Sequence, residues 1–257
     1  MDKGLLCFIL SSEKRRDILF LLLDKPMSLK DLTNHFRVNA SGLIPRIKEL
    51  ENKNFIVKND GEYHLSHMGI ILVKKLQTMD DLIRLFEDNG RFLNEHDLTP
   101  IPTNLLCRLD EIGKCKLIET NVENMNAIHR EVYGNIAKSK SIAGISSAFD
   151  ADYPKFFLSM AMQKIPVSII TTENIIKKIE KDHANTLQSY LKCDARMYII
   201  NDIKMMFVVT NVFIAIVLYK NGVLDTSTSL ISFERSAINW GIELFEHYKQ
   251  RSKEMTI

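Results

Sequence analysis

The part of this chain best suited to binding another molecule is a run of three small residues, with an arginine one helical turn later. Ala40, Ser41 and Gly42 are expected to open a helix, where free backbone N–H groups and the positive helix end can hold a phosphate or a base edge. Arg46 can make a two-pronged contact with guanine, or else a phosphate contact. Pro45 either kinks this helix, because its ring clashes with the Ser41 carbonyl, or presents an apolar surface to a thymine methyl.

The elements around this helix have the order of a winged helix-turn-helix. Three helices are indicated before residue 53, with Ser28 as the cap of the second and Asn39 as the cap of the third. Two short strands, over 55–58 and 62–65, follow and are joined by a tight-turn sequence. The side chains expected to reach neighbouring phosphates or the minor groove are Lys30, Arg37, Lys58, Asn59 and His64.

Two other interpretations of this segment stay open. Winged-helix domains also serve as protein-docking modules, in which case no DNA is read. Arg46 could pair with Glu49 or Asp31 on the surface and remain solvated. In the same helix, the periodicity of Leu43, Ile47 and Leu50 requires these three to point inward.

The rest of the chain predicts a helical connection and a second domain. A helix from Ser66 to about Asn89 is followed by a polar, proline-containing linker that ends at Pro102. Beyond it, strands and helices alternate through residue 200, which implies a largely parallel sheet, and three closely spaced strands over 205–233 then imply antiparallel pairing. The expected fold is therefore mixed, α+β or α/β. It has a winged domain over 1–68, a helix and linker over 69–102, and a mixed α/β sheet domain over 103–257 that is expected to sense a ligand or to regulate.

Ligands of α/β sheets bind beyond the carboxyl ends of the strands, and polar residues gather at two such ends. These residues predict a ligand site, made up of Ser146, Asp150, Asp152, Tyr153 and Thr172. Helix capping explains several of the same side chains. None of the seven histidines lies in a metal-binding or phosphotransfer motif, so no catalytic residue, metal or cofactor is expected.

Composition and charge are those of a globular protein without a marked preference for polyanions. The formal net charge is +2, and residues 1–70 hold 11 Lys and Arg against 9 Asp and Glu. A basic DNA-binding surface would therefore require the basic side chains to gather on one face, because their excess over the acidic ones is small. The four cysteines form no C-x-x-C pair and suit the reducing cytoplasm, although Cys107 and Cys115 could act as a redox pair. No stretch approaches the ~20 apolar residues that span a bilayer, so no membrane association is expected.

Three stretches resemble a known family. They are the recognition helix around Pro45, the long helix that ends in Leu85-Phe86, and the tail that begins Asn239-Trp240-Gly241. Together they resemble the methanogenesis and filament-formation regulators of methanogenic archaea, whose winged domain is of the MarR and ArsR type. The resemblance implies a transcription regulator that binds double-stranded DNA. It does not identify a small-molecule ligand.

The long helix over 69–86 has more apolar face than a small winged domain can cover, and symmetric operators favour two-fold proteins. A homodimeric regulator with a small-molecule effector is therefore the leading hypothesis, and packing of this helix on its own second domain is the alternative. The competing functions are a docking module for transcription machinery and an enzyme with an ancillary winged helix.

Overall fold

The protein consists of two compact units, Met1–Asp80 and Asp81–Ile257. A computed structural model describes residues 4–120, 124, 126–193 and 195–256. The long helix α5 (His67–Glu95) begins in the first unit and ends in the second. The two units are described separately below.

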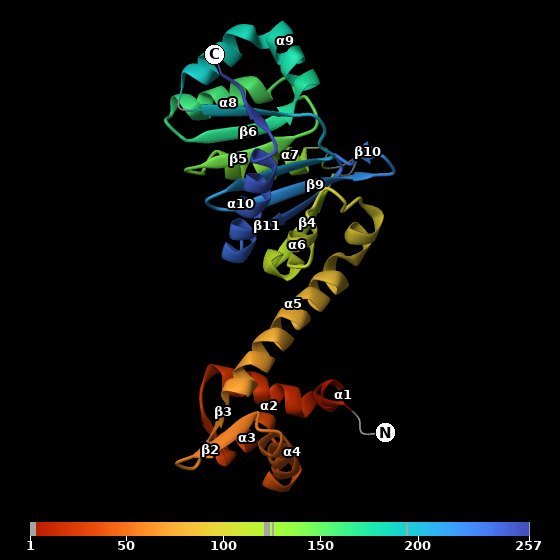
Figure 1. Ribbon diagram of the computed structural model, residues 1–257, viewed down its shortest axis with the longest axis vertical. Coiled ribbons are helices and arrows are strands. Elements are labelled where there is room, and N and C mark those ends of the chain that lie inside the picture. The colour runs from red at the N-terminus through yellow and green to blue at the C-terminus, as the bar shows by residue number, and fades with distance from the viewer. Residues whose placement is uncertain (1–3, 121–123, 125, 194, 257) are drawn as a thin grey trace. The chain divides into compact units, whose positions relative to one another are not determined.

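The first unit is a winged helix-turn-helix. Its elements are α1 (Leu5–Leu10), α2 (Glu13–Asp24), β1 (Met27–Ser28), α3 (Leu29–Phe36), α4 (Ala40–Asn52), β2 (Ile56–Asn59), β3 (Glu62–Leu65) and the start of α5 (Figure 1). The three strands form an antiparallel sheet in the order β1-β3-β2. The wing turn places Asp60 and Gly61 at φ values of 49° and 88°, the left-handed backbone of a two-residue hairpin turn. The predicted fold of this segment is confirmed.

Local signals in the sequence set the boundaries of the helices in this unit. Ser12 caps α2 by accepting a hydrogen bond from the Arg15 N–H. Ser28 and Asp31 form a reciprocal capping box at the start of α3. The inward positions predicted for α4 are all buried, together with the apolar faces of α2 and α3. These core residues include Ile18, Leu19, Leu32, Leu43, Ile47 and Leu50.

The second unit is built on one mixed sheet with the strand order β12-β7-β6-β5-β8-β9-β11-β4, and β10 pairs with β9. The strands are β4 (Cys115–Glu119), β5 (Ile142–Ser146), β6 (Val167–Thr172), β7 (Ala195–Ile200), β8 (Met205–Thr210), β9 (Ile214–Lys220), β10 (Val223–Leu224), β11 (Thr228–Ser232) and β12 (Lys253–Glu254). Among the described residues of this sheet, β5, β6 and β7 pair in parallel and the other pairings are antiparallel. The expected mixed α/β class is confirmed.

Helices cover both faces of this sheet. Residues of α7 (Ala127–Ile136), α8 (Tyr153–Met162) and α9 (Glu173–Lys192) share one buried cluster with one face of β5, β6 and β7 (Figure 1). The other face packs on α10 (Arg235–Lys249), α6 (Thr103–Leu106), the short 3-10 helix Leu109–Ile112 and the end of α5. The sheet therefore separates two apolar layers.

The tail of the chain lies against the second apolar layer. Trp240 is fully buried, and its indole Nε1 donates a 2.9 Å hydrogen bond to the Leu105 carbonyl. Gly241, next to it in α10, faces the sheet so closely that a Cβ would lie 2.9 Å from Ile214 and 3.0 Å from Phe207. The contact between α10 and the sheet therefore requires a residue without a side chain at position 241.

The structure differs from the sequence-based expectation in several places, and α1 (Leu5–Leu10) is a fourth helix before residue 53 where three were expected. Helix α5 continues to Glu95, and the segment expected to be a linker contributes buried Phe92 and Ile101 to the core of the second unit. The sequence predicts a helix over 173–181, but helix α9 extends to Lys192, with non-helical torsions at His183. Strand β4 is antiparallel, because its neighbour is β11 at the far edge. Helix α7 starts at Ala127, and Met125 of the helix expected over 124–138 lies outside the described residues.

Within the described part of the chain, no helix is both long and apolar enough to cross a membrane.

Candidate nucleic-acid interface and ligand cavity

Helix α4 presents one continuous exposed face. Ser41, Pro45, Lys48 and Asn52 recur at i, i+4, i+7 and i+11 and are all exposed, as is Gly42. The face opposite to this one carries the buried Leu43, Ile47 and Leu50. The helix continues through Pro45 to Asn52 and is not broken there. Because proline has no N–H, the usual helical hydrogen bond to the Ser41 carbonyl cannot form.

Arg46 belongs to a network of three charged side chains. Its guanidinium lies 2.8 Å from Glu49, one turn further along α4, and stays 43% exposed. The other carboxylate oxygen of Glu49 lies 2.6 Å from Arg15, which is buried and stacks over the Phe8 ring at 4.0 Å. Burial disfavours the charged form of Glu49, but the two arginines outweigh this and lower its pKa. Glu49 therefore binds both guanidinium groups. The Arg46–Glu49 pair is one of the two surface pairs that the sequence suggested for Arg46.

The remaining residues predicted to contact DNA lie around α4 on neighbouring elements. Lys30 is exposed on α3, and Arg37 is exposed in the turn before α4, with a left-handed φ of 52°. Lys58 and Asn59 are exposed on the wing, and the Lys58 ammonium lies 5.3 Å from the centre of the Tyr63 ring. His64 is half-buried on β3.

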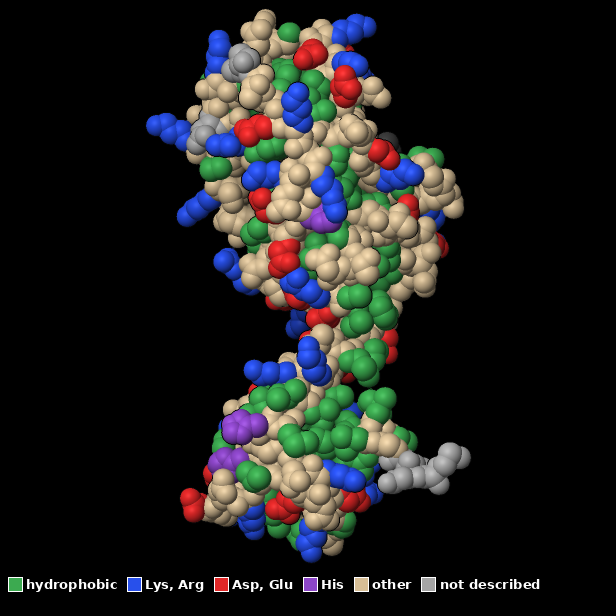
Figure 2. Space-filling model, in the orientation of Figure 1, with side chains coloured by type: hydrophobic (Ala, Val, Ile, Leu, Met, Phe, Trp, Pro, Cys, Tyr) green, Lys and Arg blue, Asp and Glu red, His purple; other side chains and the backbone are tan. Residues whose placement is uncertain are grey.

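The charge on this unit is mixed rather than concentrated. Asp60 and Glu62 are exposed at the wing tip, beside Lys58. On the face shown in Figure 2, the Lys and Arg side chains of the winged unit are interspersed with Asp, Glu and apolar side chains. The wing tip is therefore poorly suited to phosphate, and the exposed face of α4 is the better candidate for DNA contact.

Sequence reasoning missed Lys48. Its position was available from the helical period, since it shares the exposed face with Ser41 and Pro45. Unlike Arg46, it has no ion pair among those found in the described part of the chain. Lys48 is therefore a charge on this face that is free to meet a phosphate.

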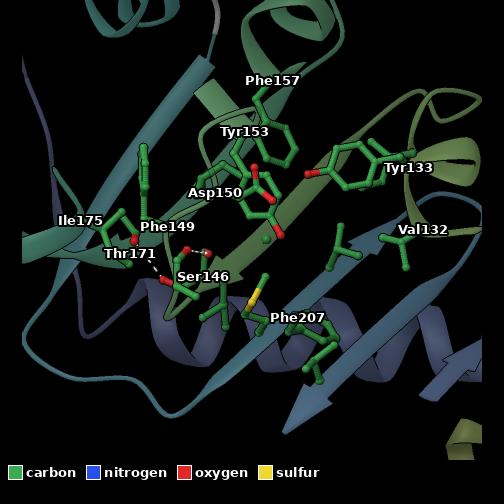
Figure 3. A pocket seen from close by; sticks show the side chains of 18 of the residues that line it. Val132, Tyr133, Ser146, Phe149, Asp150, Tyr153, Phe157, Thr171, Ile175 and Phe207 are labelled. Carbon is green, nitrogen blue, oxygen red and sulfur yellow. Dashed lines mark hydrogen bonds between the residues drawn. The ribbon is translucent and has the colours of Figure 1, made fainter. Parts of the chain in front are cut away.

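The second unit contains a cavity of about 340 Å³ between the sheet and helices α7, α8 and α9. Its walls are mostly apolar and include several aromatic rings, labelled in Figure 3. Gly144 of β5 is among the lining residues, and a Cβ at this position would lie 3.2 Å from Ile169, so a side chain there would crowd the wall. A volume of this size is within the range of small-molecule sites.

Tyr133 is the polar group at the centre of this cavity. Figure 3 shows its hydroxyl directed across the space toward Asp150 and Tyr153. The Tyr153 hydroxyl lies close enough to interact with this buried hydroxyl and to alter its pKa, but no hydrogen bond of ordinary geometry joins the two. Burial, with a smaller contribution from the neighbouring Tyr153, Asp150 and Asp152, raises the pKa of Tyr133, so the phenol is neutral and able to donate. The ring stacks on His129, with 4.0 Å between centroids.

The structure brings together three of the five residues predicted for a ligand site. Ser146, Asp150 and Tyr153 line the cavity, whereas Asp152 and Thr172 do not. The strand end is held by Thr171, which donates 2.9 Å to the Ser146 carbonyl, and by the Ser146 hydroxyl, which donates to the Ala148 carbonyl. Thr172 is the N-cap residue of α9. The side chains of Thr172 and of Asp152, the N-cap residue of α8, make no capping hydrogen bond, so only the strand-end contact of Ser146 explains part of the predicted set.

The sequence did not single out Tyr133, His129 or the aromatic walls of the cavity. His129 and Tyr133 are spaced i, i+4 on α7, which places both rings on one helix face. Only the packing of α7 against the sheet shows that this face lines a cavity.

The two cysteines considered as a redox pair have different environments. Cys107 is exposed, whereas Cys115 is half-buried and accepts a hydrogen bond from Asn89 at 3.4 Å. Burial raises the pKa of the Cys115 thiol to about 11, so it is a poor nucleophile at neutral pH.

These features define a winged helix-turn-helix protein with an exposed recognition helix and a separate α/β unit that contains a cavity. Two family models match the chain: residues 4–85 match the N-terminal domain of the methanogenesis regulatory protein FilR1, and residues 125–251 match its middle domain. The chain belongs to this family of archaeal regulators, as the sequence resemblance predicted.

The methanogenesis regulatory protein FilR1 of Methanothrix harundinacea is 28% identical over 253 residues, which are 95% of this chain. The chain spans only 56% of the length of that relative. Among solved structures, TrmBL2, an archaeal chromatin protein, is similar with a TM-score of 0.46 and 13% identity, over 92% of this chain and 91% of that one. Quinone-bound YodB of B. subtilis has a TM-score of 0.30 and 24% identity, over 32% of this chain and 93% of that one.

Proposed function

We propose that the protein is a cytoplasmic transcription regulator that reads DNA sequence through the exposed face of α4. The observation that carries this proposal is a complete winged helix-turn-helix whose recognition helix keeps Ser41, Pro45 and Lys48 uncovered on one face. The small residues at its start allow the backbone to approach a groove, and Arg46 and Lys48 can reach base edges or phosphates. The name of the FilR1 relative, a regulatory protein, agrees with this role.

We propose further that two copies bind together through α5. Met68, Leu72, Met79, Leu82 and Phe86 follow the alternating four- and three-residue spacing of a coiled-coil seam, with Lys75 as the one polar member. In the first unit, Met68 is 55% exposed, and the neighbouring Ile71 is 66% exposed. Burying this seam against a second copy would remove apolar surface from water and give the two-fold symmetry of an operator.

The cavity in the second unit is the proposed effector site. A ligand that binds one arrangement of the dimer better than another would shift the balance between them and so change the affinity for DNA. The cavity residues Ser146, Asp150 and Tyr153 carry this part of the proposal.

Fluorescence anisotropy of labelled DNA tests DNA reading. The full chain is titrated into its own upstream fragment and into random DNA of the same length, across a salt series. Tighter binding of the upstream fragment, with affinity that falls steeply with salt, is expected. Equal weak binding of both fragments would reject sequence reading.

A second candidate function is a docking module that contacts another protein through the winged unit. The specific observation in its favour is the mixed charge of the wing, with Asp60 and Glu62 exposed beside Lys58. Weak binding that does not distinguish DNA sequences would favour this candidate.

A further inference from the structure

We propose that the cavity of the second unit binds a mainly apolar small molecule that bears no negative charge and places its polar end against the Tyr133 hydroxyl. This inference rests on the proposed effector role of the cavity and names the class of effector. It is carried by the composition of the walls, the position of the Tyr133 hydroxyl and the charges around it.

The walls determine the body of the ligand. Val132, Phe149, Phe157 and Ile175 converge on the space from four different segments (Figure 3). Polar side chains occupy a minor part of the lining, so most of the ligand surface would contact carbon atoms. Such a site favours a molecule whose apolar body leaves water on binding.

The Tyr133 hydroxyl determines the polar end. Three buried side-chain polar atoms lack a hydrogen-bond partner in the described part of the chain, and two belong to this region: the Tyr133 hydroxyl and the hydroxyl of Ser147, between the lining residues Ser146 and Ala148. A buried hydroxyl without a partner is costly, and a ligand that supplies one recovers that cost. Because the phenol stays neutral, it can donate to a carbonyl or accept from an amine.

The surrounding charges exclude an anion. No Lys or Arg is among the described residues that line the cavity, whereas the carboxylate of Asp150 is. Asp150 and Asp152 both lie close enough to Tyr133 to contribute to its raised pKa, which follows mainly from burial. A carboxylate or phosphate placed there would be desolvated and would face these like charges, whereas the Lys178 ammonium at the wall already lies over the Phe149 ring, 4.3 Å from its centre.

Displacement of a neutral fluorescent probe, 1-N-phenylnaphthylamine, from the full chain tests this inference. Three competitors share one skeleton and differ only at the polar end: 4-phenylbutanamide, 4-phenylbutylamine and 4-phenylbutanoate. The amide and the amine are expected to displace the probe at concentrations at least about tenfold below the carboxylate. An equal or stronger effect of the carboxylate, or no binding of the probe, would overturn the inference.

Two variants locate the binding. Val132→Phe fills the cavity and should abolish probe binding, whereas the matched Val223→Phe, on exposed β10, should leave it unchanged. Tyr133→Phe keeps the ring and should weaken the amide about fivefold without affecting the probe, while Tyr219→Phe, outside the cavity, should do nothing. Unchanged amide binding in Tyr133→Phe would contradict the assignment of the polar end.

Anisotropy with upstream DNA, measured in the same samples, separates this inference from the proposed function. If the amide binds in the cavity but leaves DNA affinity unchanged, the ligand class stands and the effector role fails. If DNA is bound but the competitors do not follow the predicted order, the DNA-binding role stands and the ligand class fails.

Discussion

The His96 imidazole lies within hydrogen-bond distance of the Asp225 carboxylate, a contact that joins the end of α5 to the segment after β10. The imidazole Nε2 lies 3.0 Å from the Asp225 carboxylate, and Nδ1 lies 2.8 Å from the Phe92 carbonyl. Partial burial opposes the charge on Asp225, but hydrogen bonds from Ser227 and His96 outweigh it and lower the pKa of the carboxyl.

Replacing Asp225 by Asn should destabilise the protein in a pH-dependent way. The pKa of Asp225 is lower in the folded state than in the unfolded chain, so its carboxylate stabilises the fold above the ordinary Asp value near ~4. That contribution is lost as the pH falls through the lowered folded-state pKa. Urea unfolding at pH 7 should show a loss of about 1–3 kcal/mol for Asp225→Asn. The difference from wild type should shrink below about pH 4. Asp182→Asn, exposed on α9, is the control, and a difference that is constant with pH would refute the stabilising role of the Asp225 carboxylate.

Lys48→Ala and Arg46→Ala should weaken DNA binding in different ways. Lys48 has no ion-pair partner among the described residues and is expected to contact a phosphate. Its loss should therefore lower affinity similarly for all sequences and reduce the salt slope by about 1. Arg46→Ala should cost about 1–3 kcal/mol and relax discrimination between upstream and random DNA. Anisotropy titrations measure both, with Lys140→Ala in the second unit as control. Wild-type affinity in both variants would exclude α4 as the reading helix.

Pro45→Ala should stabilise the winged unit. Alanine restores the N–H donor to the Ser41 carbonyl and removes the clash of the proline ring, a gain of about 1–3 kcal/mol in a helix interior. Thermal unfolding of the variant checks this, and Ser41→Ala on the same face is the control. A melting temperature at or below that of wild type would mean that Pro45 makes a stabilising contact.

Gly241→Ala should destabilise the second unit although alanine favours helices. The added methyl would press on Ile214 and Phe207 at 2.9 and 3.0 Å, and overpacking of this kind costs about 1–3 kcal/mol. The matched change Gly134→Ala, in α7 with nothing within 4 Å of a Cβ, should be neutral or stabilising by up to about 1 kcal/mol. Chemical denaturation of the two variants gives the comparison. Equal effects would argue against the close packing of α10 on the sheet.

Met68→Glu should weaken self-association of the chain. A charge in the proposed α5 seam would be buried without a partner, and the dimer dissociation constant should rise about 30-fold, equivalent to about 2 kcal/mol. Sedimentation velocity across a concentration series measures this. Met162→Glu, on exposed α8, is the matched control. A wild-type chain that stays monomeric at all concentrations would remove the dimer from the proposal.

The elements predicted well from the sequence are those that local chemistry determines. The capping residue Ser28, the Asp60-Gly61 turn and the spacing of Leu43, Ile47 and Leu50 each require only a few neighbouring residues. The errors concern distant partners. Nothing near β4 indicates that it pairs with β11 rather than with the parallel strands.

In the candidate sites, too, the residues placed by a local sequence pattern were predicted, and those placed by distant contacts were not. The exposed face of α4 follows from the helical period, so most of it was predicted. Glu49 was considered as a partner of Arg46 because the two lie three residues apart, but its contact with Arg15 spans 34 residues. Tyr133 meets Asp150 and Tyr153 only because α7 and α8 pack on the same face of the sheet. No local sequence pattern predicts that these side chains lie close together.

The different environments of the cysteines make the chain suitable for distance measurements without new attachment points. Cys7 and Cys107 are exposed, and they lie one in each compact unit. Cys115 resists alkylation at neutral pH because its thiol stays protonated. Replacing the half-buried Cys193 by Ser would then leave one reactive thiol per unit. A donor and an acceptor dye on these thiols would report how the recognition helix moves relative to the cavity-containing unit when DNA or a ligand is added.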